Sequence, residues 1–214
     1  MTFLVAGAAS CAIAASAMAE TYNVEINGFV EYNQVGFGSF GDVNPGDAAT
    51  YSFQIDSTDF MNSDSFNTRG YAINPDSFNL TMGSVSMGLD LPFADTPYFV
   101  LRNDDPGVDG FFLTHGGVDW PAGLALEEPG GIAPNFEAMF PVGYEGDTLD
   151  SLNIEDAAGE YTFDGLTNFY FVILDGPFEP IGMIFDSMTI TTVPAPATAI
   201  ALLPFLAGAR RRRS

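Results

Sequence analysis

Apolar and polar residues alternate with a period of two over most of this chain. Residues 50–56 alternate strictly, and residues 77–87 and 187–191 repeat the pattern. A strand has this period because its successive side chains point to opposite faces, whereas an amphipathic helix has a period of 3.6. Residues 169–174 form a continuous apolar run of strand length, which indicates a central strand covered on both sides. The chain is therefore expected to be mostly β.

Glycine and proline clusters separate the alternating runs. They lie at residues 44–47, 103–107, 128–131 and 175–177. Short strands with this punctuation favour an antiparallel arrangement over helices. Since no internal repeat is visible, we expect residues 20–192 to form one antiparallel β-sandwich of jelly-roll-like type.

One short helix is expected within this β-rich region. Asp147 or Thr148 can cap its N-terminus, and Gly159 can end it. The opening strand region, residues 22–35, leaves two alternatives at Asn27 and Gly28: a hairpin turn, or a bulge within one long strand.

The first nineteen residues, 1–19, have the composition of a secretory signal peptide. Residues 3–17 are apolar and uncharged, and Ala17 and Ala19 form an A-x-A cleavage site for signal peptidase ahead of Glu20. The apolar segment is too short and too rich in alanine for a stable membrane span. We therefore expect the chain to be exported.

The last residues, 193–214, have three parts. A proline-marked motif consists of Pro194, Ala195 and Pro196. An apolar run follows at residues 197–208, and the chain ends with a basic cluster of Arg210, Arg211, Arg212 and Arg213. The arginines would stay on the cytoplasmic side while the apolar run lies in the bilayer. At about a dozen residues, this run suits a transient transmembrane segment rather than a lasting anchor.

This tripartite arrangement resembles the PEP-CTERM sorting signal, which exosortase enzymes read in bacteria that export surface and biofilm proteins. Pro194, Ala195 and Pro196 stand where the family usually has Pro-Glu-Pro, so the resemblance implies a variant exosortase specificity. It also implies processing by an exosortase-type membrane protease. The protein would then reach the cell envelope, the cell surface or the extracellular matrix.

Parts of the body resemble a β-sandwich often found ahead of such tags. The matching pieces are a Gly46-Asp47 turn leading into residues 51–53, Gly70-Tyr71 before residues 78–81, and the segments 109–113 and 186–190. The ectodomains of this family have no single assigned activity. The resemblance therefore supports architecture and export, and it transfers no catalytic residue.

The body between the two ends is strongly acidic. Residues 20–192 hold all 28 acidic residues of the chain and only two basic ones, Arg69 and Arg102, which leaves a formal charge of −26. Such a surface repels nucleic acid, so no nucleic-acid partner is expected. This region also lacks cysteine, so a core rather than disulfides must stabilise it.

The sequence lacks the residues that most catalytic mechanisms require. The only histidine, His115, precedes a glycine pair and is expected in a solvent-facing loop, with no G-x-S-x-G motif beside it. One histidine and no cysteine in the body cannot build a typical zinc or copper site. Glu127 and Glu128 are adjacent, so on a strand they would point to opposite faces. We therefore do not expect an enzyme. The alternative is a secreted, polysaccharide-acting hydrolase whose carboxylate pair comes from separate strands.

Calcium is the one cofactor for which the sequence offers candidate ligands. Asp104, Asp105 and Asp109 lie on one tight segment, and Ca²⁺ prefers hard oxygen ligands. The spacing is not that of an EF-hand loop. The alternative is that these carboxylates only solvate the loop.

Trp120 is the candidate for carbohydrate binding. It is the only tryptophan of the chain and stands between Asp119 and Pro121. An exposed aromatic beside polar groups can stack against a sugar ring, whereas a buried one would fill the core or brace a loop. The favoured function is that of a non-catalytic surface or matrix protein of unknown specific activity, a structural or binding module linked to exopolysaccharide.

Overall fold

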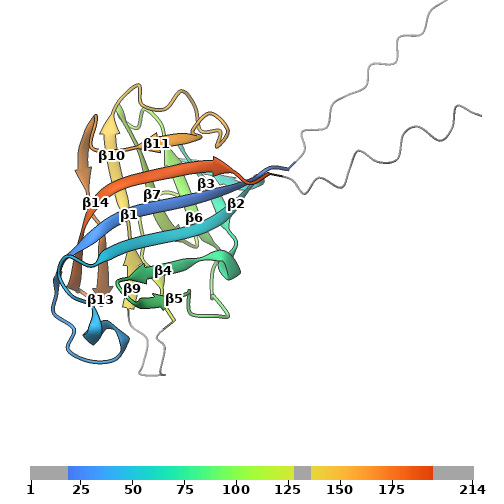
Figure 1. Cartoon of the computed structure of the whole chain (residues 1–214). Coiled ribbons are helices and arrows are strands. Elements are labelled where there is room, and N and C mark those ends of the chain that lie inside the picture. The colour runs from blue at the N-terminus through green and yellow to red at the C-terminus, as the bar shows by residue number, and fades with distance from the viewer. Residues whose placement is uncertain (1–18, 128–135, 195–214) are drawn as a thin grey trace, which may run out of the picture.

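Fourteen antiparallel strands form the described part of the chain, residues 19–127 and 136–194 of a computed structural model (Figure 1). The strands of the first half are β1 (Thr21–Asn33), β2 (Ala48–Asn62), β3 (Thr68–Ile73), β4 (Asn79–Met82), β5 (Val85–Met87), β6 (Pro97–Arg102) and β7 (Val108–His115). Those of the second half are β8 (Leu124–Ala125), β9 (Phe136–Met139), β10 (Pro141–Glu145), β11 (Gly159–Tyr161), β12 (Leu166–Phe169), β13 (Val172–Asp175) and β14 (Phe178–Thr192). Two 3-10 turns, η1 (Ser39–Asp42) and η2 (Pro75–Ser77), are the helical elements of the described residues.

The period-two pattern is confirmed in β2. Tyr51, Phe53 and Ile55 are all buried, and their neighbours are partly exposed. The alternating segment 77–87 is not one strand but the hairpin β4–β5, which turns at Gly83, where φ is +57°.

A bulge interrupts β1 rather than a hairpin turn. The register of β1 against β14 shifts between Asn27 and Gly28, and β1 continues as one long strand. A Cβ at Gly28 would lie 2.1 Å from the backbone oxygen of Ile184. Glycine therefore lets β1 and β14 approach each other here.

The strands belong to one curled sheet instead of the two separate sheets expected for a sandwich. Eleven of its strands follow the order β12-β10-β7-β6-β3-β2-β1-β14-β13-β9-β8, while β11 pairs with β14, and β4 pairs with β2 and β5. Only Phe140 separates β9 from β10, and only Tyr170 and Phe171 separate β12 from β13. β10 pairs with β12 beside β7, and β9 pairs with β13 beside β14. β9–β10 and β12–β13 are therefore two continuous, bent segments. Each begins in one edge region of the sheet and ends in the other, so the sheet curls around its core.

The prediction of one continuous strand over residues 169–174 is wrong, because the chain bends within this segment: β12 ends at Phe169 and β13 begins at Val172. Tyr170 donates its backbone N–H to Pro141, and Phe171 accepts from Met183 on β14. The chain thus changes pairing partners in the middle of the apolar run. Phe171 points into the core, where its ring meets that of Tyr51 edge-on at 4.9 Å.

The helix expected between Asp147 and Gly159 is absent, and this segment forms turns. The backbone N–H groups of Thr148 and Leu149 donate to the buried Asp109 carboxylate instead of starting a helix. The hydroxyl of Tyr71, further along, donates to Leu152 O and accepts from Ile154 N. Contacts with β3 and β7 therefore replace the intrahelical hydrogen bonds.

Both ends of the folded body lie side by side (Figure 1). Tyr22 pairs with Thr192, and Val193 N donates to Thr21 O at 2.8 Å. Ala19, Val193 and Pro194 are exposed, whereas the rest of the predicted signal peptide and sorting tail lies outside the described residues. Within the described ranges, no helix has the length and apolarity needed to cross a membrane.

Candidate functional site

The loop between β7 and β8 packs on the outer face of the sheet. Side chains of β6 alternate between the two faces, so Phe99 joins the main core while Tyr98 and Val100 point outward. Val118 of the loop packs on these two residues and on Phe112 of β7, forming a second small apolar cluster. A Cβ at Gly70 would lie 2.4 Å from Val118 Cγ1, so the glycine leaves room for the loop.

Two buried threonines fix the backbone of this loop around Asp119. Thr68 on β3 donates its hydroxyl to Val118 O at 2.8 Å, and Thr114 on β7 donates to Trp120 O at 2.8 Å. Trp120 itself is 66% exposed. Hydrogen bonds therefore anchor the main chain at Val118 and Trp120, while the Trp120 side chain is largely exposed to solvent.

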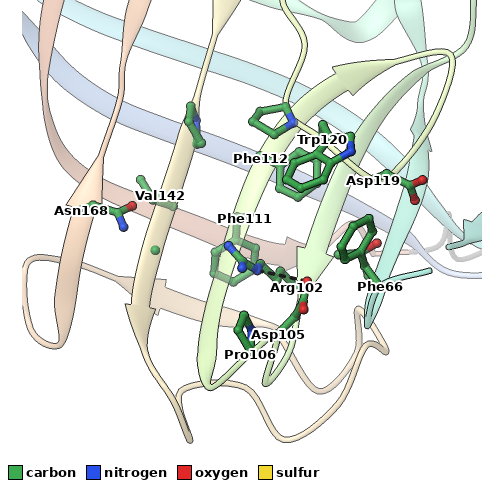
Figure 2. A pocket seen from close by; sticks show the side chains of 14 residues that line it. Phe66, Arg102, Asp105, Pro106, Phe111, Phe112, Asp119, Trp120, Val142 and Asn168 are labelled. Carbon is green, nitrogen blue, oxygen red and sulfur yellow. Dashed lines mark ion pairs between the residues drawn. The ribbon is translucent and has the colours of Figure 1, made fainter.

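Trp120 borders a groove, which we call the Trp120 groove (Figure 2). The groove has a volume of about 220 Å³. Phe66 packs edge-on against the indole, with 4.9 Å between ring centroids. The labelled lining residues are Phe66, Arg102, Asp105, Pro106, Phe111, Phe112, Asp119, Trp120, Val142 and Asn168. The groove thus combines an aromatic wall with several polar side chains.

The polar side chains come from strands distant in the sequence. Arg102 ends β6, and its Nε lies 3.5 Å from Asp105 Oδ2. Asn168 of β12 lies against Gly143 of β10, where a Cβ would come within 2.8 Å of its Oδ1. The groove can therefore offer a guanidinium, carboxylates and an amide to a hydroxylated ligand.

The three candidate calcium ligands lie in different environments. Asp109 is fully buried, where its Oδ1 accepts from Asp104 N and its Oδ2 accepts from Thr148 N and Leu149 N, at 2.7–2.8 Å. Asp105 forms the ion pair with Arg102. Among residues 19–127 and 136–194, no group of three potential ligands is arranged to hold a metal ion. Calcium binding by Asp104, Asp105 and Asp109 stays a prediction.

Tyr161 lies close to this buried carboxylate. Burial, with a smaller effect of the Asp109 charge, raises the pKa of Tyr161 to about 12. Its hydroxyl is therefore neutral at physiological pH, and it donates to Ala157 O at 2.8 Å. Asp109 and Tyr161 together organise the turns that replace the expected helix.

His115 is the last residue of β7 and not a loop residue as expected. It is partly buried, its Nδ1 lies 2.7 Å from Gly123 O, and its ring meets Phe93 edge-on. A second pocket of about 170 Å³ beside it is also lined by Asp90, Asp95 and Glu137. Glu127 is exposed after β8, and Glu128 lies outside the described residues.

Sequence reasoning selected Trp120 but missed its surroundings. Phe66, Arg102 and Asn168 come from three separate parts of the chain, and no local motif connects them. Of these three residues, only Arg102 could have been selected from the sequence, because it is one of only two basic residues in an acidic body.

Comparison with known proteins finds no counterpart of this chain. No family model, no curated protein and no solved structure matches it.

Proposed function

We propose that this chain is an exported, non-catalytic protein of the bacterial surface or extracellular matrix, and that it binds polysaccharide at the Trp120 groove. The observation that carries the binding role is that Trp120 is exposed although its main chain is fixed by Thr114. Single exposed apolar residues are common on protein surfaces. A fixed aromatic beside a polar groove is a more specific arrangement.

The chemistry of a sugar ring fits this arrangement. One face of a pyranose presents C–H groups that can stack on the flat indole, while its hydroxyls remain free for hydrogen bonds. Asp119, Asp105 and Asn168 line the same groove and can accept or donate such bonds. The hydrogen bond to Trp120 O and the contact of Phe66 with the indole restrict Trp120 before binding, which would reduce the conformational entropy lost when a ligand binds.

The two predicted targeting segments support the proposed location. Signal peptidase would cut after Ala19, and an exosortase-type protease would process the chain at Pro194, Ala195 and Pro196. The adjacent positions of Thr21 and Val193 are compatible with both steps, because both processing sites then lie at one place on the body.

Fluorescence tests the binding role directly, because Trp120 is the only tryptophan. We expect envelope polysaccharide from the native host to shift or quench its emission. In calorimetry, Trp120→Ala should weaken binding by about ten-fold or more, as expected for an aromatic anchor. Phe178→Ala is the matched control, because Phe178 is 71% exposed and does not line the groove.

Two outcomes would contradict the proposal. Equal affinity of Trp120→Ala and wild type would leave Trp120 with only a packing role against Phe66. Release of reducing ends during the titration would favour the hydrolase alternative, for which Asp90, Asp95 and Glu137 beside His115 are the carboxylates that share a pocket.

A further inference from the structure

The charges in the Trp120 groove restrict what kind of sugar it can accept. Three charged side chains line the groove: Arg102, Asp105 and Asp119. Asp105 is paired with Arg102, so its carboxylate offsets the guanidinium charge. The negative charge of Asp119, next to Trp120, then has no positive partner among the residues that line the groove. The groove as a whole is negative despite containing an arginine.

The rest of the body adds to this negative potential. Its other arginine, Arg69, lies over the ring of Phe60 and donates to Asn62 and Asn153, and it does not line the groove. With 28 acidic residues in the body, a polyanionic strand would approach a repulsive surface. This repulsion reaches over about 8 Å at physiological ionic strength.

The remaining recognition groups suit uncharged hydroxyls. Carboxylates accept hydrogen bonds from sugar hydroxyls, and the Asn168 amide can both donate and accept. Arg102 Nε is buried and has no hydrogen-bond partner among the described residues, and it lies 3.5 Å from Asp105 Oδ2. The Arg102 side chain as a whole is partly exposed and lines the groove, so its terminal N–H groups are the ones that could donate to a hydroxyl or ring oxygen. A uronate carboxylate could also bind Arg102, but it would have to compete with Asp105 and lie close to Asp119.

We propose that the Trp120 groove selects neutral sugar residues and rejects uronates, with Asp105 and Asp119 as the specificity-determining residues. This inference rests on the proposed polysaccharide binding and names its ligand class. Selection comes from charge at the groove itself, while Trp120 supplies the stacking surface.

The experiment compares two sets of oligosaccharides of equal length by Trp120 fluorescence. One is a panel of neutral glucans and mannans, and the other contains the corresponding uronates. Each is titrated at about 0.01 M and about 1 M NaCl, where the Debye length is about 30 Å and about 3 Å. We expect neutral chains to bind with a Kd that salt changes less than about two-fold. Uronates should bind at least about ten-fold more weakly at low salt, with a smaller difference at high salt.

A double variant separates the groove from the overall charge. Asp105→Asn/Asp119→Asn keeps hydrogen-bonding capacity but removes both negative charges, so uronate affinity at low salt should rise by about ten-fold or more. The control Asp59→Asn/Asp186→Asn changes the net charge equally at exposed positions that do not line the groove. It should leave the uronate affinity within about two-fold of wild type.

Each alternative outcome has a distinct meaning. Tighter binding of uronates than of neutral chains would overturn the selectivity while leaving polysaccharide binding intact. An equal gain in the control variant would show that overall charge and not the groove sets the preference. No fluorescence response to either set, nor to the native polysaccharide, would overturn both the selectivity and the proposed function.

Discussion

Tyr51 and Tyr71 are buried in the same core but differ in what their hydroxyls contact. Tyr51 is fully buried, and its hydroxyl has no hydrogen-bond partner among the described residues. Burial alone raises its pKa above the ordinary value for tyrosine. The hydroxyl of Tyr71 donates to Leu152 O at 2.8 Å and accepts from Ile154 N at 3.0 Å. The Tyr51 hydroxyl therefore lowers the stability of the fold, whereas the Tyr71 hydroxyl raises it.

Replacing each tyrosine by phenylalanine should give opposite results. Tyr51→Phe removes an unpaired polar group, so the free energy of unfolding should stay equal or rise by about 1 kcal/mol. Tyr71→Phe leaves Leu152 O and Ile154 N without their partner, and should lower it by about 1–3 kcal/mol. Urea denaturation of the two variants measures both effects. Equal losses would mean that the Tyr51 hydroxyl has a favourable contact.

At the same scale, the sequence allowed prediction of the core better than of the groove. The alternation over residues 50–56 places Tyr51, Phe53 and Ile55 on one face of a strand, and all three are buried in the structure. The exposure of Trp120 could not be predicted, because it depends on the packing of Val118 across β6 and on the hydrogen bond to Val118 O from Thr68, 50 residues earlier in the chain. Local patterns carry no information on such contacts.

Among the elements, the segment after β10 shows how a tertiary contact overrides a local signal. Asp147 and Thr148 are good helix-capping residues, but Asp109 of β7 takes the N–H groups of Thr148 and Leu149. The acceptor Asp109 and the two donating N–H groups are about forty residues apart in the sequence. The third bond of Asp109, from Asp104 N, closes the tight turn before β7.

Removing this carboxylate should destabilise both segments together. Asp109→Ala leaves three backbone N–H groups without an acceptor in a buried site, so the free energy of unfolding should fall by about 3 kcal/mol or more. Asp59→Ala is the control, since Asp59 is an exposed aspartate of β2 and should change it by less than about 0.5 kcal/mol. Chemical denaturation gives the comparison. Similar values for the two variants would contradict a structural role of Asp109.

The long strands also show which predictions can be made without a fold. The strand region at residues 22–35 corresponds to β1, and the alternation at residues 187–191 identified the last part of β14. The bulge at Gly28 was one of two alternatives that local reasoning left open. The break at Tyr170 could not be foreseen, because an apolar run of this length is compatible with one strand or with two that serve different edges.

For the whole molecule, charge should make stability depend on salt. The body has 28 acidic residues and two arginines, and its folded state concentrates this charge. We expect the Tm to rise by several degrees between about 0.01 M and about 1 M NaCl, because salt screens the repulsion. A Tm that is independent of salt would show that the acidic residues are already compensated.

The same measurement examines the calcium prediction. Calcium binding by Asp104, Asp105 and Asp109 predicts that millimolar CaCl₂ raises the Tm more than NaCl of equal ionic strength. The double variant Asp104→Ala/Asp105→Ala should lose this excess and keep the general salt effect. Identical responses of wild type to the two salts would contradict a calcium site on this loop.

The side-by-side ends have a mechanical consequence. β1 starts and β14 finishes at the same end of an antiparallel pair, so tension applied between the two termini would open the Tyr22–Thr192 pair first and then its neighbours one by one. When the force acts between the two termini, the residue pairs of β1 and β14 separate one after another instead of sharing the load. If either of the proposed cleavages takes place, no pulling force could pass from one terminus to the other, and the β1–β14 pair would carry no tension between the ends of the chain.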